Sequence, residues 1–228
     1  MTISRHNLFG AGLAAAALAS TDAARAAMGK GPTETNLRPD GTYATVDLAK
    51  DAWTLGVVQS RVMALNAAKP EPRKRENLQH MLDLIDYAQG YGGKKDLLFF
   101  HEFPITGYSY EWGRKEALKI AIDIPGPETE ALAKKAKQHD CWLVFGSYAR
   151  DPDWPDHLLS ITSVMDNQGR IVDKHWKARN IKGVFVGFEL FTTTIHDALD
   201  RYVEMYGYDA VVPVTRTPLG NICTSSIQ

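Results

Sequence analysis

The sequence predicts an α/β fold with a mixed sheet, and three observations support this class. Short apolar runs of strand length alternate with longer helix-like segments from residue 53 onward. Turns rich in Gly, Pro, Asn and Asp separate these runs. Two later pairs of apolar runs lie close enough in sequence to form hairpins. Strand–helix alternation favours parallel pairing and hairpins require antiparallel pairing, so we expect both kinds.

The first half of the pattern begins with a strand predicted at residues 53–59. A helix follows from about Arg73 to Gln89, because its apolar residues recur on one face of a 3.6-residue period. Those residues are Leu78, Met81, Leu82, Ile85 and Ala88. The glycine-rich residues 90–93 end this helix. Residues 97–100 are continuously apolar, as in a strand covered on both faces.

The middle of the chain continues the alternation. A turn at residues 125–128 opens a second helix that runs to about His139. Residues 141–148 form the next predicted strand. Residues 158–165 and 171–176 are predicted to pair as a hairpin.

The last part of the chain predicts a helix over residues 196–207 and a final hairpin. The two strands of that hairpin are expected at residues 211–214 and 221–227. They would turn near Pro218-Leu219-Gly220.

The composition is that of an ordinary globular protein. The chain has 228 residues, of which 44% are hydrophobic and 23% charged, and its net charge is −1. This charge balance gives no reason to expect nucleic acid as a partner. No H-x-x-x-H or C-x-x-C spacing is present, so no metal site is expected. The two cysteines, Cys141 and Cys223, both lie in strand-like runs that are typical of buried thiols.

The N-terminus resembles an export signal. Residues 1–26 combine a basic start, an uncharged apolar stretch and the A-x-A pattern Ala24-Arg25-Ala26, which predicts a secretory signal peptide. The start is similar to a twin-arginine signal in which His6 replaces the second arginine. We therefore expect an exported protein, periplasmic or secreted, without membrane contact after signal removal. A non-functional Ala-rich tail is the alternative. Residues 27–50 read as a leader and residues 51–228 as the folded domain.

Two side chains could carry chemistry. Glu102 directly follows an apolar strand, at the edge of the sheet where α/β proteins bind ligands, so it could act as a general base. Lys177 also follows a strand and could stabilise developing negative charge. Each has a plainer alternative, since Glu102 could cap a turn and Lys177 could be a solvated surface lysine. The aromatics Tyr108, Tyr110 and Trp112 are expected to pack in the core rather than line a pocket.

Several segments, read in order, resemble the nitrilase superfamily of carbon–nitrogen hydrolases. Residues 97–108, LLFFHEFPITGY, are similar to the segment around that family's catalytic glutamate. Residues 169–177, GRIVDKHWK, resemble its lysine segment and place the catalytic lysine on Lys177 rather than Lys174. Residues 56–59, 124–129 and 144–148 also match family segments.

This resemblance implies a nitrilase-like αββα sandwich, usually a homo-oligomer, with no metal or organic cofactor. It implies hydrolysis of a non-peptide C–N bond in a small amide or nitrile. Glu102 would be the base, Lys177 would stabilise negative charge and a cysteine would be the nucleophile. Many members carry a second glutamate downstream of the lysine, and Glu189 is the best match here.

The resemblance fails at the nucleophile. The family pattern after Pro218-Leu219-Gly220 places the cysteine at position 227, where this chain has Ile227. Cys223 comes four residues earlier, or about 13 Å along a strand at about 3.3 Å per residue. Ser226 needs a shift of one residue, which turns its side chain to the other face unless a bulge restores it.

The chain also stops where family domains continue, so we expect the C-terminal part of the sandwich to be missing. Three interpretations stay open. The protein could be an active hydrolase that uses Ser226 or Cys223, a non-catalytic or truncated homologue, or a binding subunit that assembles with another nitrilase-like chain.

Overall fold

The computed structural model describes residues 45–61, 63–180 and 191–224. Three predicted features lie outside these residues: the signal peptide at residues 1–26, the second glutamate Glu189, and the segment with Ser226 and Ile227.

The centre of the fold is a mixed sheet, which confirms the predicted fold class. Its strands are β1 (Leu55–Val58), β2 (Leu97–Phe100), β3 (Ile122–Asp123), β4 (Trp142–Arg150), β5 (Leu159–Met165) and β6 (Ile171–Trp176). The strand order is β1-β2-β4-β5-β6, and β3 pairs separately with β4. Strands β1, β2 and β4 run parallel, whereas β4, β5 and β6 run antiparallel. The predicted hairpin is β5–β6.

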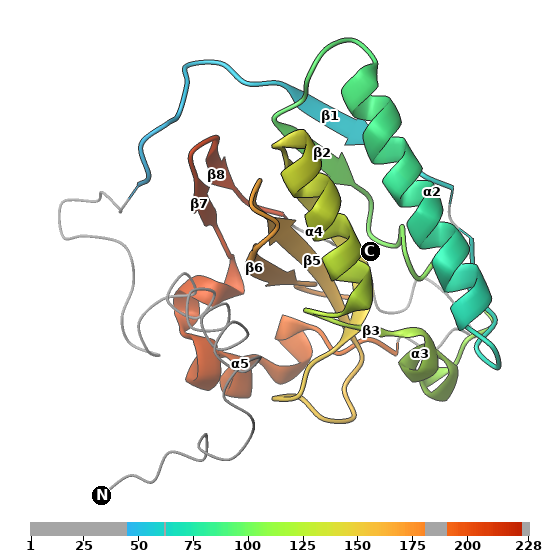
Figure 1. The fold of residues 1–228 in the computed structure, drawn as a ribbon. Coiled ribbons are helices and arrows are strands. Elements are labelled where there is room, and N and C mark those ends of the chain that lie inside the picture. The colour runs from blue at the N-terminus through green and yellow to red at the C-terminus, as the bar shows by residue number, and fades with distance from the viewer. Residues whose placement is uncertain (1–44, 62, 181–190, 225–228) are drawn as a thin grey trace, which may run out of the picture.

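Helices α2 (Glu71–Gly90) and α4 (Pro127–His139) cover one face of this sheet. Helix α5 (Leu199–Tyr206) packs in the same core cluster, whereas helix α3 (Arg114–Ile120) packs in a separate cluster with Tyr148 of β4. Two 3₁₀ turns lie at Ile195–Ala198 and Tyr208–Val211. Helices α2 and α4 lie side by side across the sheet (Figure 1). Their residues Ile85 and Leu132 are fully buried in one cluster with Leu98, Leu143 and Phe145 of the strands. The apolar stripe predicted for α2 therefore faces the main core.

A short hairpin covers part of the opposite face. It consists of β7 (Thr215–Thr217) and β8 (Gly220–Ile222). Leu219 in its turn packs in a second cluster with Val144 of β4 and Val164 of β5. Successive residues of a strand point to opposite faces, so Val144 faces the hairpin while Leu143 and Phe145 face the helices. The layers therefore follow in the order helices, sheet, hairpin.

The prediction of the last hairpin was wrong in its position. Residues 208–211 form a 3₁₀ turn after Gly207, which has a positive φ of 83°, so the apolar run at 211–214 is not a strand. Strand β8 ends at Ile222 rather than continuing through Thr224. The amide of Thr224 donates to the ring of His175 instead of to a neighbouring strand. Helix α3 and strand β3 were not predicted, because both are too short to show a period.

Ion pairs also connect helices α2 and α4. The Asp86 carboxylate on α2 lies 2.5 Å from Lys135 Nζ and 2.6 Å from His139 Nε2 on α4. The hydrogen bond from Lys135 is the main reason that the pKa of Asp86 lies below its usual value. This carboxylate is partly exposed, so solvent weakens the interaction.

We expect Asp86→Asn to lower the free energy of unfolding by up to about 1 kcal/mol at pH 7. A lowered carboxyl pKa stabilises the fold above the unfolded pKa, and this contribution is lost as the pH falls through the folded value. The difference from the parent protein should therefore shrink below about pH 4. Urea denaturation from pH 7 to pH 3 measures it, with Asp83→Asn on the same helix as the charge-matched control. A difference that does not change with pH would contradict this account.

Candidate active site

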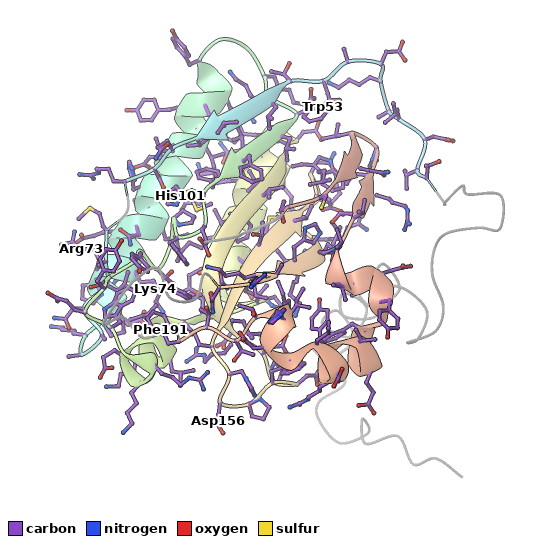
Figure 2. All side chains as sticks on the ribbon, turned by 180° about the vertical axis from the view of Figure 1, so that it is seen from behind. Trp53, Arg73, Lys74, His101, Asp156 and Phe191 are labelled. Carbon is purple, nitrogen blue, oxygen red and sulfur yellow. The ribbon has the colours of Figure 1, made fainter. Side chains whose placement is uncertain are left out.

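Glu102 lies two residues beyond β2, on the edge of the sheet where the parallel strands end. The backbone there runs against β4, since Gly146 donates its N–H to the carbonyl of His101 at 3.2 Å. The side chain of His101 (Figure 2) supports the same turn. Its Nδ1 accepts the N–H of Phe103 at 3.2 Å, and its Nε2 lies 2.6 Å from the Ser60 hydroxyl. Burial lowers the pKa of His101, which favours the neutral ring that this arrangement requires.

Gly146 allows Glu102 to approach β4 closely. A Cβ at position 146 would lie 2.4 Å from the carbonyl oxygen of Glu102 and 2.6 Å from its Cα. Both contacts are with backbone, which cannot rotate away. The segment Val144–Tyr148 was noted only as a match to the family, and the structure gives its glycine a physical role beside Glu102.

Lys177 follows β6 and lies against Glu102. Its Nζ is 3.2 Å from Glu102 Oε1, and its side chain is only 4% exposed. Its backbone N–H donates to the carbonyl of Ser160 on β5 at 2.9 Å, which extends the antiparallel pairing by one residue. The alternative of a solvated surface lysine is thus wrong. The fold brings together two residues that are 75 positions apart in the sequence.

Ser160 is the residue at this site that the sequence did not indicate. Its hydroxyl donates to Glu102 Oε1 at 2.9 Å, so the same carboxylate oxygen faces both Ser160 and Lys177. Ser160 is buried and pairs in register with Tyr148 of β4. Strand β5 contains another buried serine, Ser163, and no pattern in the sequence distinguishes the two.

Aromatic rings pack beside Glu102. Phe103 stacks on Tyr148 at 4.4 Å between ring centroids, and Tyr148 contacts Phe191 at 5.7 Å. Burial and then the negative charge of Glu102 raise the pKa of Tyr148, so its hydroxyl stays protonated. Trp112 is buried and Tyr108 packs against the same cluster, whereas Tyr110 is largely exposed. The expectation of core packing therefore holds for Trp112 and Tyr108 but not for Tyr110.

The two cysteines have different surroundings. Cys141 is buried in the main core, and burial raises the pKa of its thiol to about 11. Cys223 is exposed, which contradicts the expectation of a buried thiol there. Among the described residues, no cluster of His, Cys, Asp and Glu has the arrangement of a metal site. In the same part of the chain, no helix combines the length and apolarity of a membrane span.

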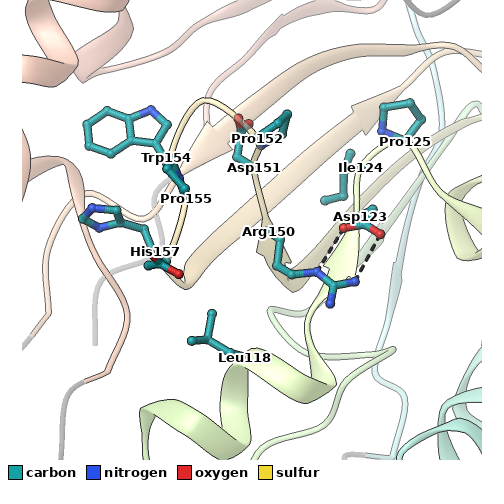
Figure 3. Close-up of a pocket in the computed structure, with 11 residues that line it drawn as sticks. Leu118, Asp123, Ile124, Pro125, Arg150, Asp151, Pro152, Trp154, Pro155 and His157 are labelled. Carbon is teal, nitrogen blue, oxygen red and sulfur yellow. Dashed lines mark hydrogen bonds and ion pairs between the residues drawn. The ribbon is translucent and has the colours of Figure 1, made fainter.

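A cavity of about 640 Å³ lies elsewhere, where β3 and β4 end. Arg150 and Asp123 point toward one another at this cavity and form a two-bonded ion pair at 3.0 and 3.1 Å (Figure 3). Pro125, Pro152 and Trp154 are among the other residues that line it. Neither Glu102 nor Lys177 belongs to the lining, so this cavity is separate from the Glu102–Lys177 pair.

Comparison with known proteins points to one family. A family model described as carbon-nitrogen hydrolase matches residues 54–227. A bifunctional nitrilase/nitrile hydratase of Lupinus angustifolius is 32% identical over 83% of this chain and 52% of its own length. A bifunctional nitrilase/nitrile hydratase of Nicotiana tabacum is 33% identical over 79% of this chain and 49% of its own length. The chain thus spans about half the length of these curated relatives.

The fold is shared with solved structures, of which the NitFhit protein of C. elegans is an example. The NitFhit protein of C. elegans superposes with a TM-score of 0.50 at 17% sequence identity. The match covers 76% of this chain and 37% of that protein.

We expect Gly146→Ala to lower the free energy of unfolding by about 1–3 kcal/mol, because the new methyl group forces Glu102 away from β4. Gly90→Ala is the matched control, since a Cβ there meets nothing within 4 Å. That change should be neutral or slightly stabilising near the end of a helix. Urea denaturation of both variants measures the effect. Equal stability of the two variants would show that Glu102 does not depend on the glycine.

Proposed function

Because this chain belongs to the carbon–nitrogen hydrolase family of the nitrilase superfamily, we propose that it hydrolyses a non-peptide C–N bond in a small amide or nitrile. The observation that carries this proposal is the buried contact of 3.2 Å between Lys177 Nζ and Glu102 Oε1. A base and a fixed cation at one point are what acyl transfer to a nucleophile requires. The family match and the position of this pair at strand ends support the same interpretation.

Glu102 is proposed as the general base. As a carboxylate it can take the proton of an attacking thiol or hydroxyl and later pass that proton to the leaving nitrogen. The bond from Ser160 and the close packing on Gly146 limit the freedom of this side chain. A restrained base loses less entropy on the way to the transition state.

Lys177 is proposed to stabilise the negative charge of the intermediate. Attack on an amide carbon moves an electron pair onto the carbonyl oxygen, and attack on a nitrile moves it onto nitrogen. The Lys177 ammonium is almost fully buried, so its field is weakly screened at this point. For an amide, collapse of the intermediate releases the amine or ammonia, and water then frees the acid and regenerates the nucleophile. For a nitrile, a first water adds to the covalent imidate before ammonia leaves, and a second water frees the acid.

Two side chains are candidates for the nucleophile. The family pattern places it at Ile227, which has no group that can attack. Cys223 offers a thiol that is exposed, and Ser226 offers a hydroxyl in the segment outside the described residues. A hydroxyl is the weaker nucleophile at neutral pH. Mass spectrometry of a trapped acyl-enzyme would assign the residue.

Ile227 also favours a second candidate function. A chain that keeps the fold and the Glu102–Lys177 pair but lacks the cysteine could act as a non-catalytic subunit that binds another nitrilase-like chain. Self-association is the form of assembly that we propose first, since oligomers are common in this superfamily. We further propose that residues 1–26 direct export, which an intact-mass measurement of the secreted or periplasmic protein would test.

We expect Glu102→Gln to reduce ammonia release about 10²–10⁴-fold, because glutamine cannot accept the proton. The assay uses aliphatic and aromatic amides and nitriles, including benzamide and benzonitrile, at a temperature where all variants are folded. Glu128→Gln is the matched control. Glu128 is also buried and lies 3.1 Å from a lysine, Lys74, but it belongs to helix α4, away from the proposed base.

The control should stay within about twofold of the parent rate, as a change remote from the reaction does. Equal losses in both variants would mean that the loss does not depend on a base at position 102. No release from the folded parent protein would reject the hydrolase proposal. Co-purification of a second nitrilase-like chain would then favour the subunit function.

A further inference from the structure

A second polar cluster lies on the same face of β6 as Lys177. We call it the Thr224 clamp, and it consists of Asp173, His175, Thr215 and Thr224. Asp173 and His175 alternate with Lys177 along the strand, so all three side chains point to one face. Asp173 and His175 are each only 1% exposed. The chemistry proposed above uses none of the four clamp residues.

The hydrogen bonds of the clamp are donated in sequence from Thr224 through His175 and Thr215 to Asp173. Thr224 donates its backbone N–H to His175 Nδ1 at 3.3 Å, and its hydroxyl lies 2.7 Å from the same nitrogen. Since Nδ1 accepts, a neutral ring carries its proton on Nε2. That nitrogen lies 2.7 Å from the Thr215 hydroxyl, which in turn donates to Asp173 Oδ2 at 2.7 Å.

Asp173 completes the chain of bonds. Its other oxygen accepts the N–H of Lys174 at 2.8 Å. Burial by itself would raise the pKa of Asp173, but the bonds from His175 and Thr215 hold it below its usual value. His175 Nε2 also lies 3.2 Å from Asp173 Oδ2, so each buried member has more than one partner and the clamp is expected to hold as a unit.

The clamp joins the lysine strand to the end of the β7–β8 hairpin. Thr215 belongs to β7, and Thr224 follows β8 by two residues. Leu219 holds the turn of this hairpin on Val144 and Val164, but the chain beyond Ile222 leaves the strand. At Thr224 it is the imidazole, rather than a sheet partner, that takes the backbone N–H. The position of Thr224 relative to β6 thus depends on His175.

We propose that Asp173 and His175 are positioning residues, which hold Thr224 at a fixed place relative to Lys177 and so fix the preceding residue, Cys223, relative to the Glu102–Lys177 pair. This inference rests on the proposed function. Cys223, a candidate nucleophile within the described residues, directly precedes Thr224 in the sequence. A displacement of about 1 Å at a reacting group can reduce turnover about 10²-fold.

The test compares variants of Thr224 in the full chain. Thr224→Val removes the hydroxyl at constant shape, and Thr224→Ser keeps it. Thr217→Val is the matched control, because Thr217 lies in the same hairpin and its hydroxyl donates to the carbonyl of Gly220 at 2.7 Å, outside the clamp. Each protein is examined by hydrogen–deuterium exchange of residues 218–228 and by kcat and KM for the panel substrate with the highest rate.

We expect Thr224→Val to speed amide exchange near Thr224 about 10-fold, because it removes the partly buried hydrogen bond between the Thr224 hydroxyl and His175 Nδ1. It should lower kcat about 10-fold with little change in KM, and Thr224→Ser should retain both parent values. A second pair of variants, His175→Asn and His175→Gln, tests the role of His175 directly. Asparagine at position 175 keeps an amide oxygen near the position of Nδ1, where it can accept the Thr224 N–H. The amide of a glutamine reaches the position of Nε2 instead. Only His175→Asn should therefore keep amide exchange slow at Thr224.

Equal effects of Thr217→Val and Thr224→Val on kcat would overturn the positioning role. Unchanged exchange in Thr224→Val and in His175→Gln would overturn the clamp itself. If the parent protein releases no ammonia, the proposed function fails together with the positioning role. The exchange measurement would still decide whether His175 anchors Thr224.

Discussion

The candidate site depends on one close approach, that of the Glu102 backbone to Gly146. The chain leaving β2 can pass against β4 only because position 146 carries no side chain. That passage places the Glu102 carboxylate over β5 and β6, where Ser160 and Lys177 meet one of its oxygens. A larger residue at 146 would separate a base on the parallel half of the sheet from a cation on the antiparallel half. The mixed sheet is thus what brings the two charges together.

The two faces of this sheet serve different purposes. The helix-covered face is apolar, with residues such as Leu98, Leu143 and Phe145 fully buried against α2 and α4. The opposite face carries the polar groups, including Ser160, His175 and Lys177, all buried and hydrogen-bonded. Buried polar groups are tolerated only when their partners are fixed. The helices packed on the other face hold in place the strands that carry these polar groups.

The sequence predicted the regular elements well where a period was long enough to be read. Helix α2 and strands β2, β4, β5 and β6 lie close to their expected positions, because each has a clear apolar run. The hairpin at the end was misplaced because the apolar residues 211–214 resemble a strand, while Gly207 bends the chain into a 3₁₀ turn. At the site, strand ends and the family resemblance indicated Glu102 and Lys177. Ser160 could not be found, since its role exists only through pairing between strands that the sequence does not align.

The same limit applies to the nucleophile. The family pattern after the Pro218 turn places the nucleophile at position 227, which holds an isoleucine. The offsets of Cys223 and Ser226 from that position were counted on the assumption that β8 continues as a regular strand. In the structure β8 ends at Ile222, and His175 takes the N–H of Thr224. Once a strand ends, alternation of its side chains no longer predicts which face the following residues present. The register argument that counted against Ser226 and Cys223 therefore no longer applies beyond Ile222. On the positioning role proposed above, the clamp rather than the strand is the constraint that decides whether Cys223 can reach Glu102.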